Sequence, residues 1–137
     1  MVTFMVWGMP APQGSKRFMG IKGGKGVMTE SSKKVLPWRQ DVGLAAEEAM
    51  RGRELLSGAL VLDIVFLLPR PASVSIKKRP HPSVKPDLSK LVRSTEDALT
   101  GKVWFDDAQI CSLQVSKKYS SDGRTGAEIR VFGVMEP

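Results

Sequence analysis

Carboxylates gather in one short stretch of this 137-residue chain. Residues 85–107 read KPDLSKLVRSTEDALTGKVWFDD and hold Asp87, Glu96, Asp97, Asp106 and Asp107. Carboxylates this dense repel one another unless a cation joins them, and hard cations such as Mg²⁺ prefer oxygen ligands. A solvated acidic helix face followed by an Asp-Asp turn would give the same pattern. The stretch is therefore either a metal site or an ordinary polar surface.

A helix is predicted over residues 87–100. Its apolar residues recur at spacings of three and four, at Leu88, Leu91, Val92, Thr95, Ala98 and Leu99. Asp87 suits the N-cap, where its carboxylate can accept hydrogen bonds from the free N–H groups of the first turn. Gly101 suits the position after the C-cap. The polar face carries Ser89, Arg93, Glu96 and Thr100. Glu96 is therefore predicted to lie on the same helix face as Ser89 and Arg93, the face that begins beside Asp87.

The charge balance indicates a polyanionic partner. A net charge of +7, from 21 basic and 14 acidic residues, is most simply explained by nucleic acid binding. A basic surface around an acidic pocket is what a metal-dependent nuclease needs, although many RNA-binding proteins are equally basic. Only one histidine, His81, and one cysteine, Cys111, are present, so a Cys/His zinc cluster is excluded.

Two basic segments are candidates for contact with phosphates. Residues 15–30 form a predicted hairpin or loose loop with a Gly-Lys tip, and residues 69–86 form a proline-rich irregular loop. His81 lies between two prolines of the second loop and is predicted to be an exposed residue, not a ligand or base. Each segment could equally be a solvated loop.

The remaining elements predict a single small α+β domain spanning residues 1–137, with a mixed, mostly antiparallel sheet covered by two helices. Strands are expected at residues 1–8, 59–68, 108–119 and 127–134, and a helix at residues 37–56 with Trp38, Val42, Ala45, Ala46 and Ala49 on its apolar side. The Asp-Gly pair within residues 121–126 predicts a hairpin turn. Asp63, alone in an apolar strand, either faces solvent or approaches the acidic site.

The expected cellular compartment is inferred from the lone cysteine and from the absence of membrane-span and signal-peptide patterns. Cys111 lies in an apolar stretch and is predicted to be a buried thiol in a reducing environment. No stretch approaches the roughly 18 apolar residues of a membrane span. The N-terminus shows no charged region followed by a cleavage site, so a signal peptide is not expected. A cytoplasmic location, in a bacterium or a phage-infected bacterial cell, is the expectation.

The central stretch resembles the RusA family of Holliday-junction resolvases. The likeness comprises the Lys-Pro-Asp lead-in, the helix ending DALTG, the VWFDD segment and the lysine-bearing strand ending KKY. An early segment, GMPAPQGSKR at residues 8–17, matches as well, so the resemblance spans about 120 residues. It implies a RusA-like fold and a small basic homodimer that binds four-way DNA junctions and nicks two strands with Mg²⁺, or Mn²⁺ as a substitute.

The resemblance also assigns residues. By the resemblance, catalytic roles fall on Asp87, Asp106, Asp107 and Arg93, and metal ligation falls on Asp87, Asp106 and Asp107. Glu96 is a further candidate for both roles, because it lies two turns beyond Ser89 on the same helix face. Arg93 stands where the family usually has a lysine. Ser89 departs from the family because it replaces the second aspartate of Asp-x-Asp. Either Glu96 supplies the missing charge, or the protein binds junctions but cleaves them weakly or not at all.

Contact with DNA is expected from the basic residues Lys16, Arg17, Lys22, Lys25, Lys77, Lys78, Arg79, Lys85, Lys90, Lys117 and Lys118. The expected function is Mg²⁺-dependent resolution of four-way DNA junctions in recombination and repair, by paired nicks. Two other interpretations share the basic surface: a junction-binding protein without cleavage, for which metal does not matter, and an RNA-binding domain, which would prefer RNA.

Overall fold

The computed structural model describes residues 1–14, 21–22, 25–26 and 31–135. Along the chain, the elements are β1 (Val2–Trp7), β2 (Ile21–Lys22), β3 (Lys25–Gly26), α1 (Ser31–Ala49), β4 (Leu60–Leu68), α2 (Leu88–Leu99), a 3-10 turn (Asp107–Gln109), β5 (Ile110–Tyr119) and β6 (Gly126–Gly133). The predicted order of strands and helices is confirmed.

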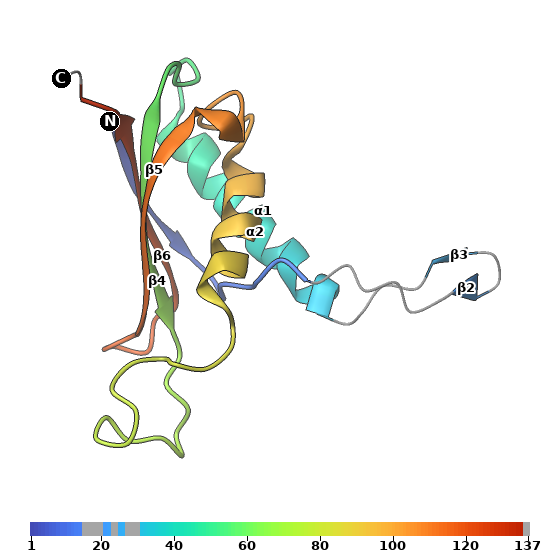
Figure 1. The fold of residues 1–137 in the computed structure, drawn as a ribbon, viewed down its shortest axis with the longest axis vertical. Coiled ribbons are helices and arrows are strands. Elements are labelled where there is room, and N and C mark those ends of the chain that lie inside the picture. Colours follow the sequence, from blue (N-terminus) through green and yellow to red (C-terminus); the bar gives the residue numbers. More distant parts are fainter. Residues whose placement is uncertain (15–20, 23–24, 27–30, 136–137) are drawn as a thin grey trace.

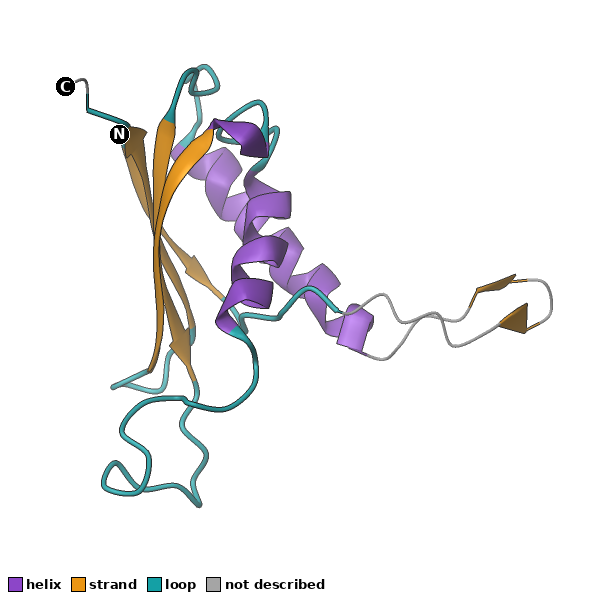
Figure 2. Cartoon of the chain, viewed as in Figure 1, coloured by secondary structure: helices purple, strands orange, loops and turns teal. Residues whose placement is uncertain are grey.

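Four strands form one sheet in the order β1-β6-β4-β5. β4 and β5 run parallel, and the other neighbouring pairs run antiparallel. A parallel pair needs a crossover connection, and here that connection contains α2. Both helices lie on the same face of the sheet, as Figures 1 and 2 show. The predicted α+β fold, with a mixed, mostly antiparallel sheet and two helices, is confirmed.

The core lies between the sheet and the two helices. Alternate residues of β4, from Leu60 through Leu62, Ile64 and Phe66 to Leu68, are buried because one face of this strand points at the helices. The largest fully buried side chains are Trp38 of α1 and Trp104, which follows α2. The indole Nε1 of Trp38 donates a hydrogen bond to Thr95 Oγ1 at 3.1 Å, which joins the two helices inside the core.

The first helix begins six residues earlier than predicted and ends at Ala49 instead of Leu56. The expected start at Pro37 was wrong because Pro37 lies inside α1. Proline in a helix interior removes one hydrogen bond and costs about 3 kcal/mol. The apolar stripe, however, begins at Val35, and Val35, Trp38, Val42 and Ala46 are all buried. We infer that this packing outweighs the local penalty of the proline.

Cys111 is exposed, so the prediction of a buried thiol was wrong. β5 is an edge strand, and its pairing with β4 shifts register so that Leu60 faces Ile110 while Val61 faces Ser112. Cys111 is the residue passed over at this irregularity. A bulged residue on an edge strand is left out of the pairing, which explains its exposure despite its apolar surroundings in sequence.

Asp63 lies on the sheet face opposite the helices, since its neighbours Leu62 and Ile64 point into the core. Its carboxylate is 3.8 Å from Arg130 Nη1 on the adjacent strand. Of the two alternatives for Asp63, the structure selects the face away from the helices. In the described part of the chain, no helix is long and apolar enough to cross a membrane.

Candidate nucleic acid groove

A groove of about 870 Å³ opens at the N-terminal end of α2. Three segments far apart in sequence line it: the stretch after β1, the first half of α1, and the chain that enters α2. Its polar and charged lining residues are Gln13, Lys34, Asp41, Lys85, Asp87 and Lys90. We call this the α2 groove. Three lysines and two aspartates thus line a groove whose volume lies in the range of sites that bind small molecules.

Asp87 is the N-cap residue of α2, as predicted, but its side chain makes no capping hydrogen bond. Its carboxylate is about half exposed and lies 3.8 Å from the Nζ of Lys90. The positive end of the helix dipole favours negative charge at this position. The carboxylate of Asp87 is therefore held at the end of a helix without being used to cap it, and it borders the groove.

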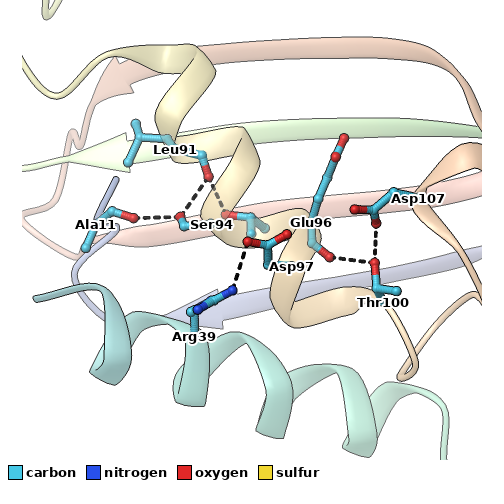
Figure 3. A network of polar contacts seen from close by, with 9 residues as sticks. Ala11, Arg39, Leu91, Ser94, Glu96, Asp97, Thr100 and Asp107 are labelled. Carbon is cyan, nitrogen blue, oxygen red and sulfur yellow. Dashed lines mark hydrogen bonds and ion pairs between the residues drawn. The ribbon is translucent and has the colours of Figure 1, made fainter. Parts of the chain in front are cut away.

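The stretch after β1 is fixed to the rest of the fold by backbone contacts. Gly8 exchanges hydrogen bonds with Thr125, and Gln13 N donates to Lys90 O at 2.9 Å. Gly8 has a φ of +152°, a conformation that other residues rarely adopt, and a Cβ there would meet Asp41 Oδ2 at 2.2 Å, so Gly8 lets Asp41 lie close to the backbone. Buried Ser94 of α2 donates to Ala11 O at 2.6 Å (Figure 3). These hydrogen bonds hold the stretch against the N-terminal half of α2, where it forms one wall of the groove.

Asp41 is a groove residue that the sequence analysis missed. It lies in α1, 46 positions before Asp87, and only the packing of α1 beside α2 brings both aspartates to the same groove. No local spacing in the sequence could have revealed this. Among the described residues, Gln13 Oε1 is a buried oxygen without a hydrogen-bond partner, and Gln13 also lines the groove. The groove thus offers oxygen atoms from two carboxylates and one amide.

A second acidic pair lies at the other end of α2. Figure 3 shows Glu96 and Asp107 at this end of the helix, with the Asp107 carboxylate turned toward Thr100. Asp107 accepts hydrogen bonds from the Thr100 hydroxyl and from Trp104 Nε1, the latter at 3.2 Å. Partial burial, and then the negative charges of Asp107 and Asp97, raise the pKa of Glu96 above its ordinary value. The two carboxylates repel each other, which is the electrostatic situation that a cation would relieve.

Asp106 has a structural role at this end of the helix. Its side chain accepts from Ala108 N at 2.8 Å, and Gln109 Oε1 accepts from Asp106 N at 3.0 Å, which completes a capping box on the 3-10 turn. Asp97 instead pairs with Arg39 of α1 at 2.8 Å. Of the predicted acidic residues here, Asp107 is the one whose charge acts most on Glu96.

The structure does not bring all the predicted ligands into one cluster. Glu96 lies nine positions after Asp87, which corresponds to an axial rise of about 13.5 Å along the helix. A single Mg²⁺, with its short metal–oxygen bonds, does not span that distance. Within the described ranges, no group of three or more Asp, Glu, His or Cys side chains is placed to hold a metal ion. Asp87 faces the groove, whereas Glu96 and Asp107 lie at the opposite end of α2.

The two unusual residues of the central helix are both exposed. Ser89 lies in the first turn of α2, and Arg93 follows Lys90 by three residues. Residues three apart on a helix are neighbours on its surface, so Arg93 extends the basic edge that Lys90 begins. Each position has room for a larger or charged side chain.

The basic loop of residues 69–86 is irregular, as predicted, but it is tied together by arginine. Arg70 donates to the carbonyl oxygens of Ser75, Arg79 and Pro80, and its guanidinium lies 4.1 Å from the centroid of the Tyr119 ring. Arg79 Nε donates to the Tyr119 hydroxyl at 2.7 Å. Lys77, Lys78 and His81 are exposed. Arg79, predicted to contact DNA, therefore already has a partner within the fold.

The other predicted DNA contacts fall in different places. Lys85 and Lys90 line the groove, and Lys118 is exposed on β5. Lys117 is half-buried and donates to two backbone carbonyls of the loop.

Lys22 and Lys25 are paired in the β2–β3 ladder, which agrees with the predicted hairpin. Lys16 and Arg17 lie outside the described residues, as does most of the segment 15–30.

Comparison with known proteins gives two matches over nearly the whole chain. The sequence profile of the family described as Endodeoxyribonuclease RusA matches residues 8–131. A protein of Bacillus subtilis (strain 168), described as uncharacterized protein YqaN, is 33% identical over 138 residues, covering 94% of this chain and 95% of YqaN. The profile match includes the stretch after β1, α1, α2 and β5, and so every element that lines the α2 groove.

Proposed function

Because this chain belongs to the RusA endodeoxyribonuclease family, we propose that it is a Mg²⁺-dependent endodeoxyribonuclease that nicks four-way DNA junctions and holds the scissile phosphate in the α2 groove. The observation that carries this proposal is the placement of Asp87. Its carboxylate lies at a helix N-terminus, in a groove lined by Lys34, Lys85 and Lys90. Metal-dependent cleavage of a phosphate diester uses both kinds of group: cations bind the phosphate oxygens, and a carboxylate binds the metal.

The chemistry of the groove suits a Mg²⁺ ion bound together with phosphate. Mg²⁺ in such sites is held by one or two carboxylates, with waters and substrate oxygens completing its shell. Asp87 and Asp41 would supply the carboxylates, and the unpartnered Gln13 Oε1 adds a third oxygen. When bound, the ion lowers the pKa of an attacking water and stabilises the leaving oxygen. Mn²⁺ has similar ligand preferences and would substitute.

The lysines and Arg93 would act on the phosphate itself. Lys85 and Lys90 flank Asp87 and bind phosphate oxygens by charge-assisted hydrogen bonds, together with the free N–H groups of the first turn of α2. Arg93 neutralises charge that develops on the phosphate in the transition state. Arginine does not lose its proton in proteins, so Arg93 acts as an electrostatic clamp and not in proton transfer.

The carboxylates at the other end of α2 remain proposed contributors. The family resemblance assigns metal ligation to Asp106 and Asp107, Glu96 is the carboxylate that would compensate for Ser89, and the negative charge of Asp107 acting on Glu96 is consistent with a cation there. In this chain such an ion would be separate from one at Asp87. Replacing Asp87 and Asp107 individually by asparagine, and measuring Mn²⁺ binding to each variant, would show whether one site or two exist.

One incubation tests the main proposal. A labelled four-way DNA junction and a linear duplex of the same sequence are incubated with the protein in Mg²⁺, in Mn²⁺ and in EDTA. We expect paired nicks in the junction with either metal, and no nicks in EDTA or in the linear duplex. If the protein binds the junction but never nicks it, the hydrolase proposal fails.

A junction-binding protein with weak or no cleavage is the second candidate, and Ser89 favours it. A serine hydroxyl is a far weaker ligand for a divalent cation than the carboxylate that the family usually has at this position. Ser89 is exposed in the first turn of α2, so Ser89→Asp should be tolerated by the fold. Strong nicking by Ser89→Asp alongside weak nicking by the unchanged chain would support this candidate. Preference for RNA over junction DNA would instead support an RNA-binding domain.

A further inference from the structure

Lys117 makes an unusual pair of contacts for a lysine of an edge strand. It lies opposite Phe66 in the β4–β5 ladder, and Phe66 is fully buried, so Lys117 points to the same side of the sheet as the helices. Its Nζ donates to Val84 O and to Pro86 O, both at 2.8 Å. These two carbonyls belong to the last residues of the basic loop, and Asp87 follows directly.

We propose that Lys117 is a positioning residue that fixes the chain entering α2 and thereby sets the place of the Asp87 carboxylate in the α2 groove. The inference rests on the proposed function for its catalytic consequence. It changes the role of Lys117 from the DNA contact expected from sequence to an internal clamp, because two of its three N–H donors are used on backbone carbonyls.

The segment that Lys117 holds needs such a clamp. The loop of residues 69–86 has no regular backbone hydrogen-bond ladder of its own, and its other anchors, Arg70 and Arg79, act on Tyr119 and on residues no later than Pro80. At the far end, the carbonyl of Asp87 accepts from Lys90 N and Leu91 N, both at 3.1 Å. Lys117 thus ties the backbone at Val84 and Pro86, directly before the first turn of α2, to the sheet.

The geometry also gives a reason for lysine at this position. A long aliphatic stem can cross the edge of the core while its ammonium group reaches polar atoms beyond it. Lys118, the next residue, pairs opposite Leu67 and points to the other face of the sheet. Neighbouring lysines therefore have different roles because a strand alternates its sides.

Lys117→Met tests the inference, because methionine keeps an unbranched apolar stem and removes the donors. We expect its nicking rate at saturating junction and Mg²⁺ to fall by about 10- to 100-fold, as for partners that orient a metal ligand. Junction affinity measured in EDTA should change less than twofold. Amide hydrogen exchange at Lys90 and Leu91, the donors to Asp87 O, should become faster. Lys117→Arg, which keeps charge and N–H donors, should restore part of the rate.

Lys102→Met is the matched control. It removes the same charge from an exposed lysine that pairs with Glu47 at the opposite end of α2, and it should leave rate and exchange unchanged. A Lys117→Met protein that loses junction affinity but keeps its saturated rate would overturn the inference and make Lys117 a DNA contact. Unchanged exchange at Lys90 and Leu91 would also overturn it. If the unaltered protein never nicks, the proposed function fails, and the exchange measurement still decides whether Lys117 positions Asp87.

Discussion

At the scale of single residues, identical side chains serve unlike purposes in this protein. Arg79, Lys117, Lys77, Lys78 and Lys118 were all predicted from the sequence to contact DNA. In the structure, Arg79 and Lys117 hydrogen-bond within the fold, whereas Lys77, Lys78 and Lys118 are exposed. Composition reports charge but not where a side chain points. The distinction arises from contacts between residues 30 or more positions apart, which no local pattern contains.

Glu96 gives a prediction about stability and pH. Its pKa is raised in the folded protein, chiefly by partial burial and then by Asp107 and Asp97. The unfolded chain therefore releases this proton at lower pH than the folded chain, so Glu96 lowers stability as pH rises through its raised pKa, and the penalty persists at neutral pH. In metal-free buffer at neutral pH, Glu96→Gln should therefore raise the free energy of unfolding and with it Tm. The gain in free energy should be less than about 1 kcal/mol, because the side chain is half exposed.

Thermal unfolding at several pH values checks this prediction. Below the ordinary carboxyl pKa, Glu96 is neutral in both states and the gain should vanish. Glu54→Gln, at an exposed glutamate, is the control and should show no such dependence. A gain that is the same at acid and neutral pH would mean that ionisation of Glu96 is not its cause. If Glu96→Gln also abolishes nicking, Glu96 supplies the charge that Ser89 lacks, as the compensation hypothesis requires.

At the scale of elements, local signals were reliable where local energies decide. The periodicity, Asp87 and Gly101 gave α2 to within one residue at each end, and Gly101 has the positive φ of +83° expected after a helix C-cap. The start of α1 was wrong because packing of Val35 and Trp38 outweighs the proline rule. Asp41 could not be assigned to the site at all, since only tertiary contact places it there.

The basic loop gives a prediction at this scale. Tyr119→Phe removes the hydroxyl that accepts from Arg79 Nε but keeps the ring beneath Arg70. Loss of one hydrogen bond to a charged group weakens the loop by about 1.5 kcal/mol, or roughly tenfold in its opening equilibrium. Trypsin should therefore cleave at Lys77 and Lys78 about tenfold faster under native conditions. Unchanged cleavage would show that Tyr119 does not hold the loop, and Tm should fall only slightly because the sheet is untouched.

At the scale of the whole molecule, the sheet has one covered and one uncovered face (Figure 2). Helices α1 and α2 and the α2 groove lie on the covered side. In the described part of the chain, β1 pairs with β6 alone, which leaves one strand edge open. Trp7, at the end of β1, is 45% exposed, and the Arg124 guanidinium lies 3.6 Å from the centroid of its ring. Strand edges and exposed aromatic residues of this kind are common contact surfaces between subunits.

We expect the protein to be a homodimer, because two symmetric nicks in a junction require two active sites. Sedimentation at micromolar concentration should give twice the single-chain mass of 15.0 kDa. Trp7→Asp, which places a charge at the proposed surface, should shift the species toward the single-chain mass while leaving Mg²⁺ binding intact. A single-chain mass for the unaltered protein would contradict the expectation.

Salt dependence tests the exposed part of the basic surface. Junction affinity should fall steeply with salt, because each neutralised phosphate contributes about 0.9 to the slope of log affinity against log salt. Replacing Lys77 and Lys78 together by alanine should lower that slope by about 1.8 if both contact phosphates. Arg79 is left in place because its loss would disturb the loop as well as the charge. An unchanged slope would remove the loop from the DNA-binding surface.

The most direct test of the central claim, that Asp87 in the α2 groove serves metal-dependent nicking, is the single-turnover nicking rate of Asp87→Asn on a four-way junction in Mg²⁺. Asp87 is exposed and makes no capping bond, so asparagine should preserve the fold. The account predicts a rate at least about 100-fold below that of the unaltered protein, with junction affinity in EDTA retained. An Asp87→Asn protein that nicks as fast as the unaltered chain would contradict it.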